Sequence, residues 1–414
     1  MDGIRPSTGS STRGRGLATG LLVGMLLISG SPLMYEMRTA VVLLLLAATV
    51  ALSSTLRAVP GWQLRCLILS GAFLLIILVH RVSFGFVSWP ANLFLLFKVV
   101  LSAYVIWAIG PRVIPGLLNA TTLLALLSFP PYLLLLLTGP QDFPTFFSES
   151  VVGDNLKSVV VLTVHMTPEW WRNSGPVWEP GAYQGIINLT FLLTPARTLI
   201  SSRHRWKVLV LLLALLTTFS TTGYIALFLV LVYKLLRLRR LGLIKVPLVA
   251  AVLAISVMTY LEADFLGEKI AQQVANTQIR EDFTPDRFGA LLFDLHYIEK
   301  NPWFGNGMHE ATRFADHPHL HGEPLGHGNG LSNFIATMGY FGLLVYLTLL
   351  WFSRTGWNNL DRSAVSLVLM LLVFGEQFMM LPLFLGLPFL RLVPIEPARR
   401  RPQVLSTSLI TTRP

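Results

Sequence analysis

The chain has 414 residues, of which 53% are hydrophobic and only 13% are charged. A soluble domain carries about 25% charged residues, so this sequence has too little polar surface to cover a water-soluble globule of its size. Its net charge of +11 falls in short clusters between apolar runs, a pattern typical of membrane topology signals, which argues against a nucleic-acid-binding protein. The single cysteine, Cys66, excludes an intrachain disulfide and a cysteine-based metal site.

Apolar runs recur along almost the whole chain. Since a transmembrane helix needs ~20 apolar residues, the sequence predicts about 12 spans. They are expected at 17–34, 39–56, 64–80, 91–109, 117–138, 182–197, 206–220, 222–236, 246–262, 331–352, 363–376 and 377–393. Polar or glycine-containing breaks are expected at 220–223 and 375–377. The expected fold class is therefore all-α, a polytopic transmembrane helix bundle with a long outer-face loop between spans 9 and 10.

Basic residues are unequally divided between the two sides of this bundle. With the N-terminus in the cytoplasm, the short outer loops hold only Arg38 and Arg81. The inner loops and the tail hold Arg57, Arg65, Arg112, Arg197, Arg203, Arg205, Lys207, Arg237, Arg239, Arg240, Lys245, Arg354, Arg362, Arg399, Arg400 and Arg401. Because cytoplasmic loops carry an excess of Lys and Arg, both termini are expected in the cytoplasm.

The spans divide the chain into six regions. These are N-terminal transmembrane helices (1–138), an outer-face loop (139–181), middle transmembrane helices (182–262), a large outer-face loop (263–330), C-terminal transmembrane helices (331–393) and a cytoplasmic tail (394–414). Within the first loop, 156–166 is apolar but too short to cross, so it is expected to lie on the membrane surface or to re-enter. The second loop is the most polar stretch of the chain.

Three ionisable residues, His80, Lys98 and Glu376, lie within or at the edge of predicted spans. Such groups are costly in lipid and mark functional interiors by default. Lys98, near the middle of a span, either faces a polar cavity or extends its amine to the membrane surface. The glycines at 339 and 342 are expected to form a close-packing face between helices.

Polar motifs follow one another in a characteristic order in the second half of the chain. Arg287 precedes the turn Asn-Pro-Trp-Phe-Gly-Asn-Gly at 301–307, and His327 and Asn329 precede a span that carries the glycines at 339 and 342. Upstream lie Arg-Asn-Ser-Gly at 172–175, Glu-Pro-Gly-Ala-Tyr at 179–183 and Phe-Ser-Thr-Thr-Gly at 219–223. The set, over roughly 165–352, resembles the O-antigen ligase and polymerase superfamily, the Wzy/WaaL-like membrane proteins.

The sequence departs from that family at two places. Gly328 separates His327 from Asn329, whereas the family's histidine abuts the asparagine. Thr221 and Thr222 stand where the family often carries an arginine, which removes one expected phosphate contact.

The resemblance implies a metal-independent membrane glycosyltransferase without a cofactor, in the bacterial inner (cytoplasmic) membrane. Such a protein polymerises or ligates surface polysaccharide by transferring a glycan from polyprenyl (undecaprenyl) diphosphate to an acceptor hydroxyl on the outer face. The expected partners are the polyprenyl-diphosphate-linked oligosaccharide, an acceptor glycan or lipid, the bilayer, a chain-length regulator and a flippase, and no nucleic acid. The alternative is a transporter or flippase of a lipid-linked or small substrate, which favours paired intramembrane charges and internal repeats.

The chemistry of this transfer suggests roles for individual residues. Arginine forks match phosphate oxygens, so Arg287, Arg172 and Arg81 are expected to bind the diphosphate. His327 is the expected catalytic base, with His321 or His319 as alternatives, because imidazole accepts protons near neutral pH. Glu179 is expected to assist the base or to bind a sugar hydroxyl. Residues expected to contact sugars are Trp170, Trp171, Trp178, Trp303, His319 and His321.

Structural readings of the same residues stay open. Arg287 is also suited to an ion pair with Asp286 or Glu281, and His327 or Glu179 to a position at a helix start. The tryptophans are also suited to the aromatic belt of a membrane interface. The histidines at 309, 317, 319 and 321 are either zinc ligands, sugar or acceptor contacts, or solvated loop residues.

Overall fold

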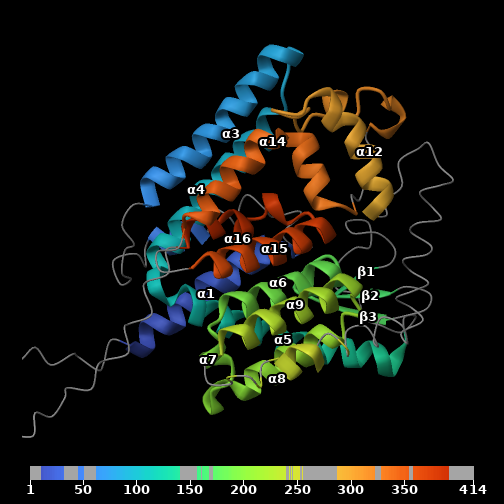
Figure 1. Ribbon diagram of the computed structural model, residues 1–414. Helices are drawn as coiled ribbons and strands as arrows, with labels where there is room; N and C mark the ends of the chain where they lie inside the picture. Colours follow the sequence, from blue (N-terminus) through green and yellow to red (C-terminus); the bar gives the residue numbers. More distant parts are fainter. Residues whose placement is uncertain are drawn as a thin grey trace, which may run out of the picture.

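The chain forms a bundle of apolar helices with one small sheet at its edge (Figure 1). The computed structural model describes residues 11–31, 45–50, 62–139, 156–159, 161–166, 171–238, 242, 244, 246–251, 254, 287–321, 328–353 and 358–390. The named helices are α1 (Ser11–Ile28), α3 (Trp62–Phe84), α4 (Trp89–Ile109), α5 (Val113–Thr138), α6 (Pro180–Leu193), α7 (Ala196–Leu199), α8 (Arg205–Leu216), α9 (Thr221–Arg237), α12 (Arg287–Lys300), α13 (Glu310–Arg313), α14 (Gly330–Trp351), α15 (Asn359–Gly375) and α16 (Pro382–Leu385). The strands are β1 (Leu156–Val159), β2 (Leu162–Met166) and β3 (Trp171–Gly175). Short 3-10 turns are η2 (Gly110–Arg112), η4 (Ser202–His204), η6 (Pro318–Leu320), η7 (Phe378–Met380) and η8 (Leu387–Phe389).

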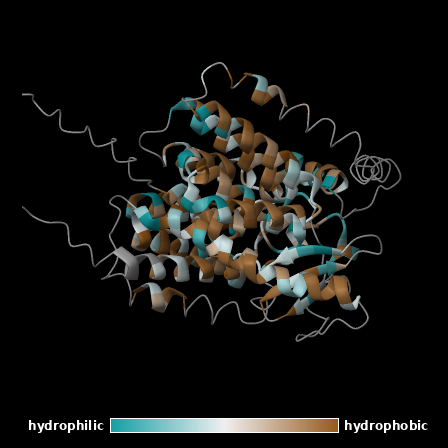
Figure 2. Cartoon of the chain, turned by 90° about the horizontal axis from the view of Figure 1, so that it is seen from below, coloured by the Kyte–Doolittle hydropathy of each residue, from teal (hydrophilic) through white to brown (hydrophobic). Residues whose placement is uncertain are grey.

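Three helical segments of the described chain are long and apolar enough to cross a membrane: Trp62–Phe84, Trp89–Thr138 and Gly330–Trp351. They contain the predicted spans 64–80, 91–109 and 117–138 and nearly all of 331–352. Leucines such as Leu67 and Leu137 point away from the protein, and Figure 2 shows apolar residues in brown along the helices. Apolar side chains left uncovered on apolar helices fit insertion into a lipid bilayer.

The other predicted spans have shorter counterparts or none. Helices α1, α6, α8, α9 and α15 fall on the spans predicted at 17–34, 182–197, 206–220, 222–236 and 363–376. The spans predicted at 39–56 and 246–262 lie mostly outside the described residues.

The expectation of a single helix over 377–393 is wrong. This part of the chain forms η7, α16 and η8 instead. Pro382 and Pro388 lack a backbone N–H and cannot continue a helix, which explains the broken course. The predicted break at 375–377 is confirmed, since α15 ends at Gly375, whereas the break predicted at 220–223 lies at 217–220, between the end of α8 at Leu216 and the start of α9 at Thr221.

The expected all-α class is wrong at one place, because β1, β2 and β3 form an antiparallel sheet in that order. The apolar stretch 156–166, expected to lie on the membrane surface or to re-enter, supplies β1 and β2. Its valines are β-branched and favour strands. Tyr132 and Leu135 of α5 pack against Val164 of β2, so the sheet is fixed to the end of α5 and holds β3 in place.

Helix α6 is the centre of the lower half of the bundle in Figure 1. All its residues are buried, and it packs against α5, α9, α15 and β3. A helix enclosed on every side is apolar all round, as this one largely is. Its N-terminus lies beside the sheet, which positions Glu179 directly before its first turn.

The turn at 301–307 docks into a kink in α14. Gly339 interrupts that helix with a φ of +72°, and the amides of Tyr340 and Phe341 donate to the carbonyls of Pro302 and Trp303 at 2.8 and 3.0 Å. Gly342 packs near Ile76 of α3, as expected for a helix-packing glycine. Gly339 does not pack against another helix as expected, because its closest neighbour is the backbone of the turn at 301–307.

We expect Gly339→Ala to destabilise the protein. An added Cβ would overlap the Trp303 carbonyl, and a φ of +72° is itself unfavourable for alanine. The yield of monodisperse protein in detergent and its thermal unfolding midpoint measure this effect. Gly71→Ala on the exposed side of α3, where nothing lies within 4 Å, is the matched control. Equal stability of the two variants would contradict the proposed packing of the turn.

Candidate functional site

Two arginines and two glutamates from four segments meet where the helix bundle borders the sheet. Arg172 lies in β3, Glu179 precedes α6, Arg287 begins α12 and Glu376 follows α15. Arg172 and Glu376 each interact electrostatically with the other three side chains. We call Arg172, Glu179, Arg287 and Glu376 the Arg-Glu cluster. It joins two regions expected to be separate outer-face loops, 139–181 and 263–330, to the end of α15.

Arg172 is held by the turn between α8 and α9. Its Nε donates to the carbonyl of Thr218 at 2.8 Å, and only 9% of the residue is exposed. Carbonyls at the end of a helix lack intrahelical partners, so α8 offers this acceptor at its terminus. Phe219 in the same turn has a φ of +44°, an uncommon conformation for a non-glycine residue. The turn thereby carries backbone strain where it binds an arginine.

Burial lowers the pKa of the Arg172 guanidinium, and the neighbouring Arg287 lowers it further. Glu179 and Glu376 act in the opposite direction. Because the ordinary pKa of arginine is so high, the group stays charged. The cluster therefore contains a permanent buried cation whose charge is compensated by carboxylates.

Arg287 is held less tightly than Arg172. Its Nη2 lies 3.5 Å from Glu376 Oε1, and its Nε donates to the Gly375 carbonyl at 3.3 Å. A hydrogen-bonded ion pair is shorter, about 2.7–2.9 Å. Asp286 and Glu281, the ion-pair partners considered from the sequence, lie outside the described residues. Arg287 is thus close to a carboxylate without being locked by it.

Glu376 is enclosed by the beginnings of two helices. Its carboxyl group lies over Gly181 in α6, and its carbonyl lies against Gly330, the first residue of α14. A Cβ at either glycine would overlap these atoms, so only glycine allows Glu376 to enter. The sequence marks Glu376 as an ionisable residue at a span edge, but nothing local to it indicates its partners.

Two helices begin at the Arg-Glu cluster, α6 after Glu179 and α14 at Gly330, and Arg287 is the first described residue of α12. The side chain of Asn329 accepts from Ser332 N at the start of α14 and donates to the carbonyl of Arg287. A helix N-terminus carries a partial positive charge and free N–H groups. Together with two guanidinium groups, these termini make the cluster electrostatically suited to an anion.

Several predicted site residues lie elsewhere. Arg81 is exposed in the last turn of α3, and the described contacts do not include it in the cluster. Trp171 packs beside the small core under the sheet, and Trp178 lies against Gly30 after α1. Trp303 is 61% exposed at the turn before α14, which leaves it the most accessible of the described candidates for sugar stacking.

The described histidines of the polar loop are engaged within the loop or with α12. His309 caps α13 by accepting from Ala311 N, and His317 Nδ1 lies 2.7 Å from the Tyr297 hydroxyl. The ring of His319 contacts that of His317, and His321 Nε2 lies 3.2 Å from the Phe314 carbonyl. The expected base His327 and the expected sugar contact Trp170 lie outside the described residues.

A second buried ion pair, missed from the sequence, ties the polar loop to the bundle. Arg313 of α13 pairs with Asp294 of α12, and Ser332 of α14 donates to the same carboxylate at 2.5 Å. Burial raises the pKa of Asp294, and Arg313 opposes that shift. Because this group joins α12 to α14, it keeps Arg287 and Asn329 in register.

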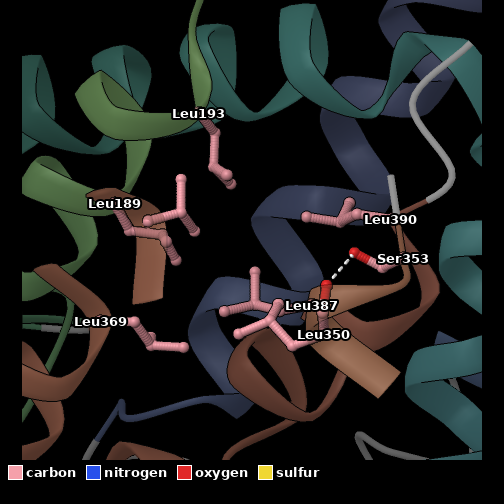
Figure 3. A pocket seen from close by; sticks show the side chains of 8 residues that line it. Leu189, Leu193, Leu350, Ser353, Leu369, Leu387 and Leu390 are labelled. Carbon is pink, nitrogen blue, oxygen red and sulfur yellow. Dashed lines mark hydrogen bonds between the residues drawn. The ribbon is translucent and has the colours of Figure 1, made fainter. Parts of the chain in front are cut away.

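A small pocket lies away from these charges (Figure 3). Leucines from α6, α14, α15 and the turn around η8 line it, and its one polar lining residue is Ser353. The Ser353 hydroxyl donates to the Leu350 carbonyl and is not free for chemistry. The pocket therefore offers packing space but no group for proton transfer or anion binding.

Three helical segments of the described chain are long and apolar enough to cross a membrane, and their uncovered apolar side chains fit insertion into a bilayer. Residues 207–347 match the family described as O-antigen ligase, which supports the resemblance to the O-antigen ligase and polymerase superfamily. No curated protein matches the chain. The family supports a general role in O-antigen ligation or polymerisation, with glycosyltransferase-like activity. The matched segment contains Arg287, whereas Arg172, Glu179 and Glu376 lie outside it.

Proposed function

We propose that this protein transfers a glycan from polyprenyl diphosphate to an acceptor hydroxyl on the outer face of the bacterial inner membrane. The observation that supports this proposal most directly is the convergence of Arg172 and Arg287 beside the N-termini of α6 and α14. The leaving group of such a transfer is a diphosphate, which carries several negative charges. Guanidinium forks and helix N-termini are both suited to phosphate oxygens.

The charge balance of the Arg-Glu cluster favours exchange of a carboxylate for a phosphate. Two guanidinium groups face two carboxyl groups in it. The 3.5 Å separation of Arg287 from Glu376 is longer than that of a strong ion pair, so a diphosphate can compete for this guanidinium. In a site poorly screened by water, such contacts are stronger than in solution.

The proposed reaction is a single displacement. The acceptor hydroxyl oxygen forms a bond to the anomeric carbon while the bond from that carbon to the diphosphate oxygen breaks. The electron pair leaves with the polyprenyl diphosphate, and the hydroxyl proton passes to a base. His327 and Glu179 are the two candidates, and Asn329, two residues after His327, contacts the Arg287 carbonyl. No metal or cofactor enters this scheme.

Deletion of the gene, followed by glycan analysis, tests the proposed function. A polymerase predicts single repeat units on the acceptor or carrier after deletion, and a ligase predicts long chains left on the carrier. A flippase, the alternative class, predicts carrier-linked units that stay accessible only from the cytoplasmic side. Unchanged surface glycan in the deletion strain would contradict all three.

The orientation of the site can be measured by cysteine labelling. In a Cys66→Ser background, Trp303→Cys should react with a membrane-impermeant maleimide in intact spheroplasts, because the exposed Trp303 turn is proposed to face outward. Trp206→Cys, at an exposed position predicted to be near the inner face, should react only after permeabilisation. The reverse pattern would place the turn on the cytoplasmic side and would contradict the proposed location of the reaction.

A further inference from the structure

We propose that Glu179 and Glu376 form one proton-accepting pair, in which Glu179 contacts the acceptor hydroxyl and Glu376 is a positioning residue behind it. This inference rests on the transfer reaction proposed above. It adds Glu376 to the functional residues and replaces a single base by two coupled carboxyl groups.

Glu376 extends its Oε1 over Gly181, two residues after Glu179, and the two carboxyl groups interact electrostatically. Their exposure differs, because Glu376 is 5% exposed whereas Glu179 is only partly buried. Two carboxylates at such a short separation repel each other, and sharing one proton relieves the repulsion. The more exposed Glu179 is therefore the member that an acceptor hydroxyl can reach.

The surroundings keep the pair fixed. The carboxyl group of Glu376 lies over Gly181 and its backbone carbonyl lies against Gly330, so the residue has no room to move toward the start of α6 or α14. Glu179 directly precedes α6, where the helix dipole favours a negative charge. The charged groups that face Glu376 are Glu179, Arg287 and Arg172. A buried carboxyl group placed against another by two required glycines is difficult to explain as packing alone.

Proton and charge movements in the proposed step are complementary. When the acceptor oxygen bonds to the anomeric carbon, its proton passes to Glu179 and is shared with Glu376. The pair loses one negative charge as the departing diphosphate gains one. Arg172 and Arg287 lie beside both groups, so they can compensate the carboxylates before the step and the diphosphate after it.

Glu376→Gln is the decisive variant. Glutamine has the same shape, and its amide can donate to Glu179, so the fold should be retained. The assay uses membranes and the lipid-linked glycan that accumulates in the deletion strain. We expect kcat to fall by about 10²-fold, the lower end of the effect of acid–base groups, with an unchanged KM for the donor. The acidic limb of the pH–rate profile should move to lower pH, because a neutral amide no longer disfavours the charged form of its neighbour.

Glu299→Gln, an exposed change on α12, is the matched control and should behave like the wild type. A folded Glu376→Gln protein with wild-type kcat and pH profile would overturn the inference. The inference would also be overturned if the acidic limb of the pH–rate profile disappeared in His327→Gln but not in the glutamate variants. If Glu376→Gln does not accumulate, Glu179→Gln decides, because that side chain is partly exposed and its loss should reduce kcat in the same way. If activity survives both glutamate changes but is lost in Arg287→Ala, the transfer reaction is supported and the carboxyl pair is not.

Discussion

Arg287→Ala should reduce glycan transfer by about 10²–10³-fold, the effect of removing one preorganised charge-stabilising group from an active site. The side chain is available to bind substrate, since its contacts with Glu376 and the Gly375 carbonyl are 3.5 and 3.3 Å long. Arg172 still faces the buried Glu376 after this change, so the protein should still accumulate in the membrane. Complementation of the deletion strain and initial rates with its lipid-linked glycan measure the effect.

Two comparison variants separate charge from shape at this position. Arg287→Lys keeps the charge but loses the planar fork, and it should fall between the wild type and alanine. Arg203→Ala, at an exposed position in η4, should leave the rate unchanged. A normal glycan profile in the Arg287→Ala strain would remove the main support for diphosphate binding by the Arg-Glu cluster.

Asp294→Ala should produce the largest loss of stability among simple substitutions in the polar loop. It would leave the Arg313 guanidinium, which is 4% exposed, without its carboxylate. Its Nη2 would keep only the 3.2 Å contact with Asn333 Oδ1, and within the described residues its Nε and Nη1 have no hydrogen-bond partner. Removing one member of a buried ion pair costs about 3–5 kcal/mol. Thermal unfolding in detergent and the amount of membrane-inserted protein measure the change.

An exposed ion pair nearby supplies the control for this prediction. Asp316 binds Lys300 and His296 at the surface, and Lys300 lowers the pKa of Asp316 by hydrogen bonding. Exposed pairs contribute little, so Asp316→Asn should change stability far less than Asp294→Ala. The double variant Asp294→Ala, Arg313→Met should recover part of the loss, because no uncompensated buried charge remains. Equal effects of the two aspartate changes would contradict the role given to burial.

The positions of the longest helices and of one break could be predicted from the sequence. Hydropathy and local breakers act over neighbouring residues, which explains the agreement for α3, α4, α5 and α14 and for the end of α15. The broken course of 377–390 also has a local cause, because Pro382 and Pro388 cannot continue a helix. These two prolines are a sequence signal against a single helix over 377–393. The sheet was harder to foresee, since short apolar runs do not distinguish strand from buried helix.

The candidate site was predicted only in part. Arg172, Glu179 and Arg287 were proposed separately, and the structure brings all three together. Arg81 was proposed on charge alone, and the described contacts leave it outside the cluster. Glu376 was noted only because an acid is unusual at the edge of a span. No sequence motif marks Asp294 and Arg313, because their burial depends on how α12, α13 and α14 pack.

Hydropathy and motif order can be read along the chain, so the sequence alone indicates an apolar helical protein that resembles the O-antigen ligase and polymerase superfamily. Which charges share a site depends on how the helices pack. Glu376 lies close to Glu179 because two glycines at distant positions leave room for it. That room exists only once the helices are packed.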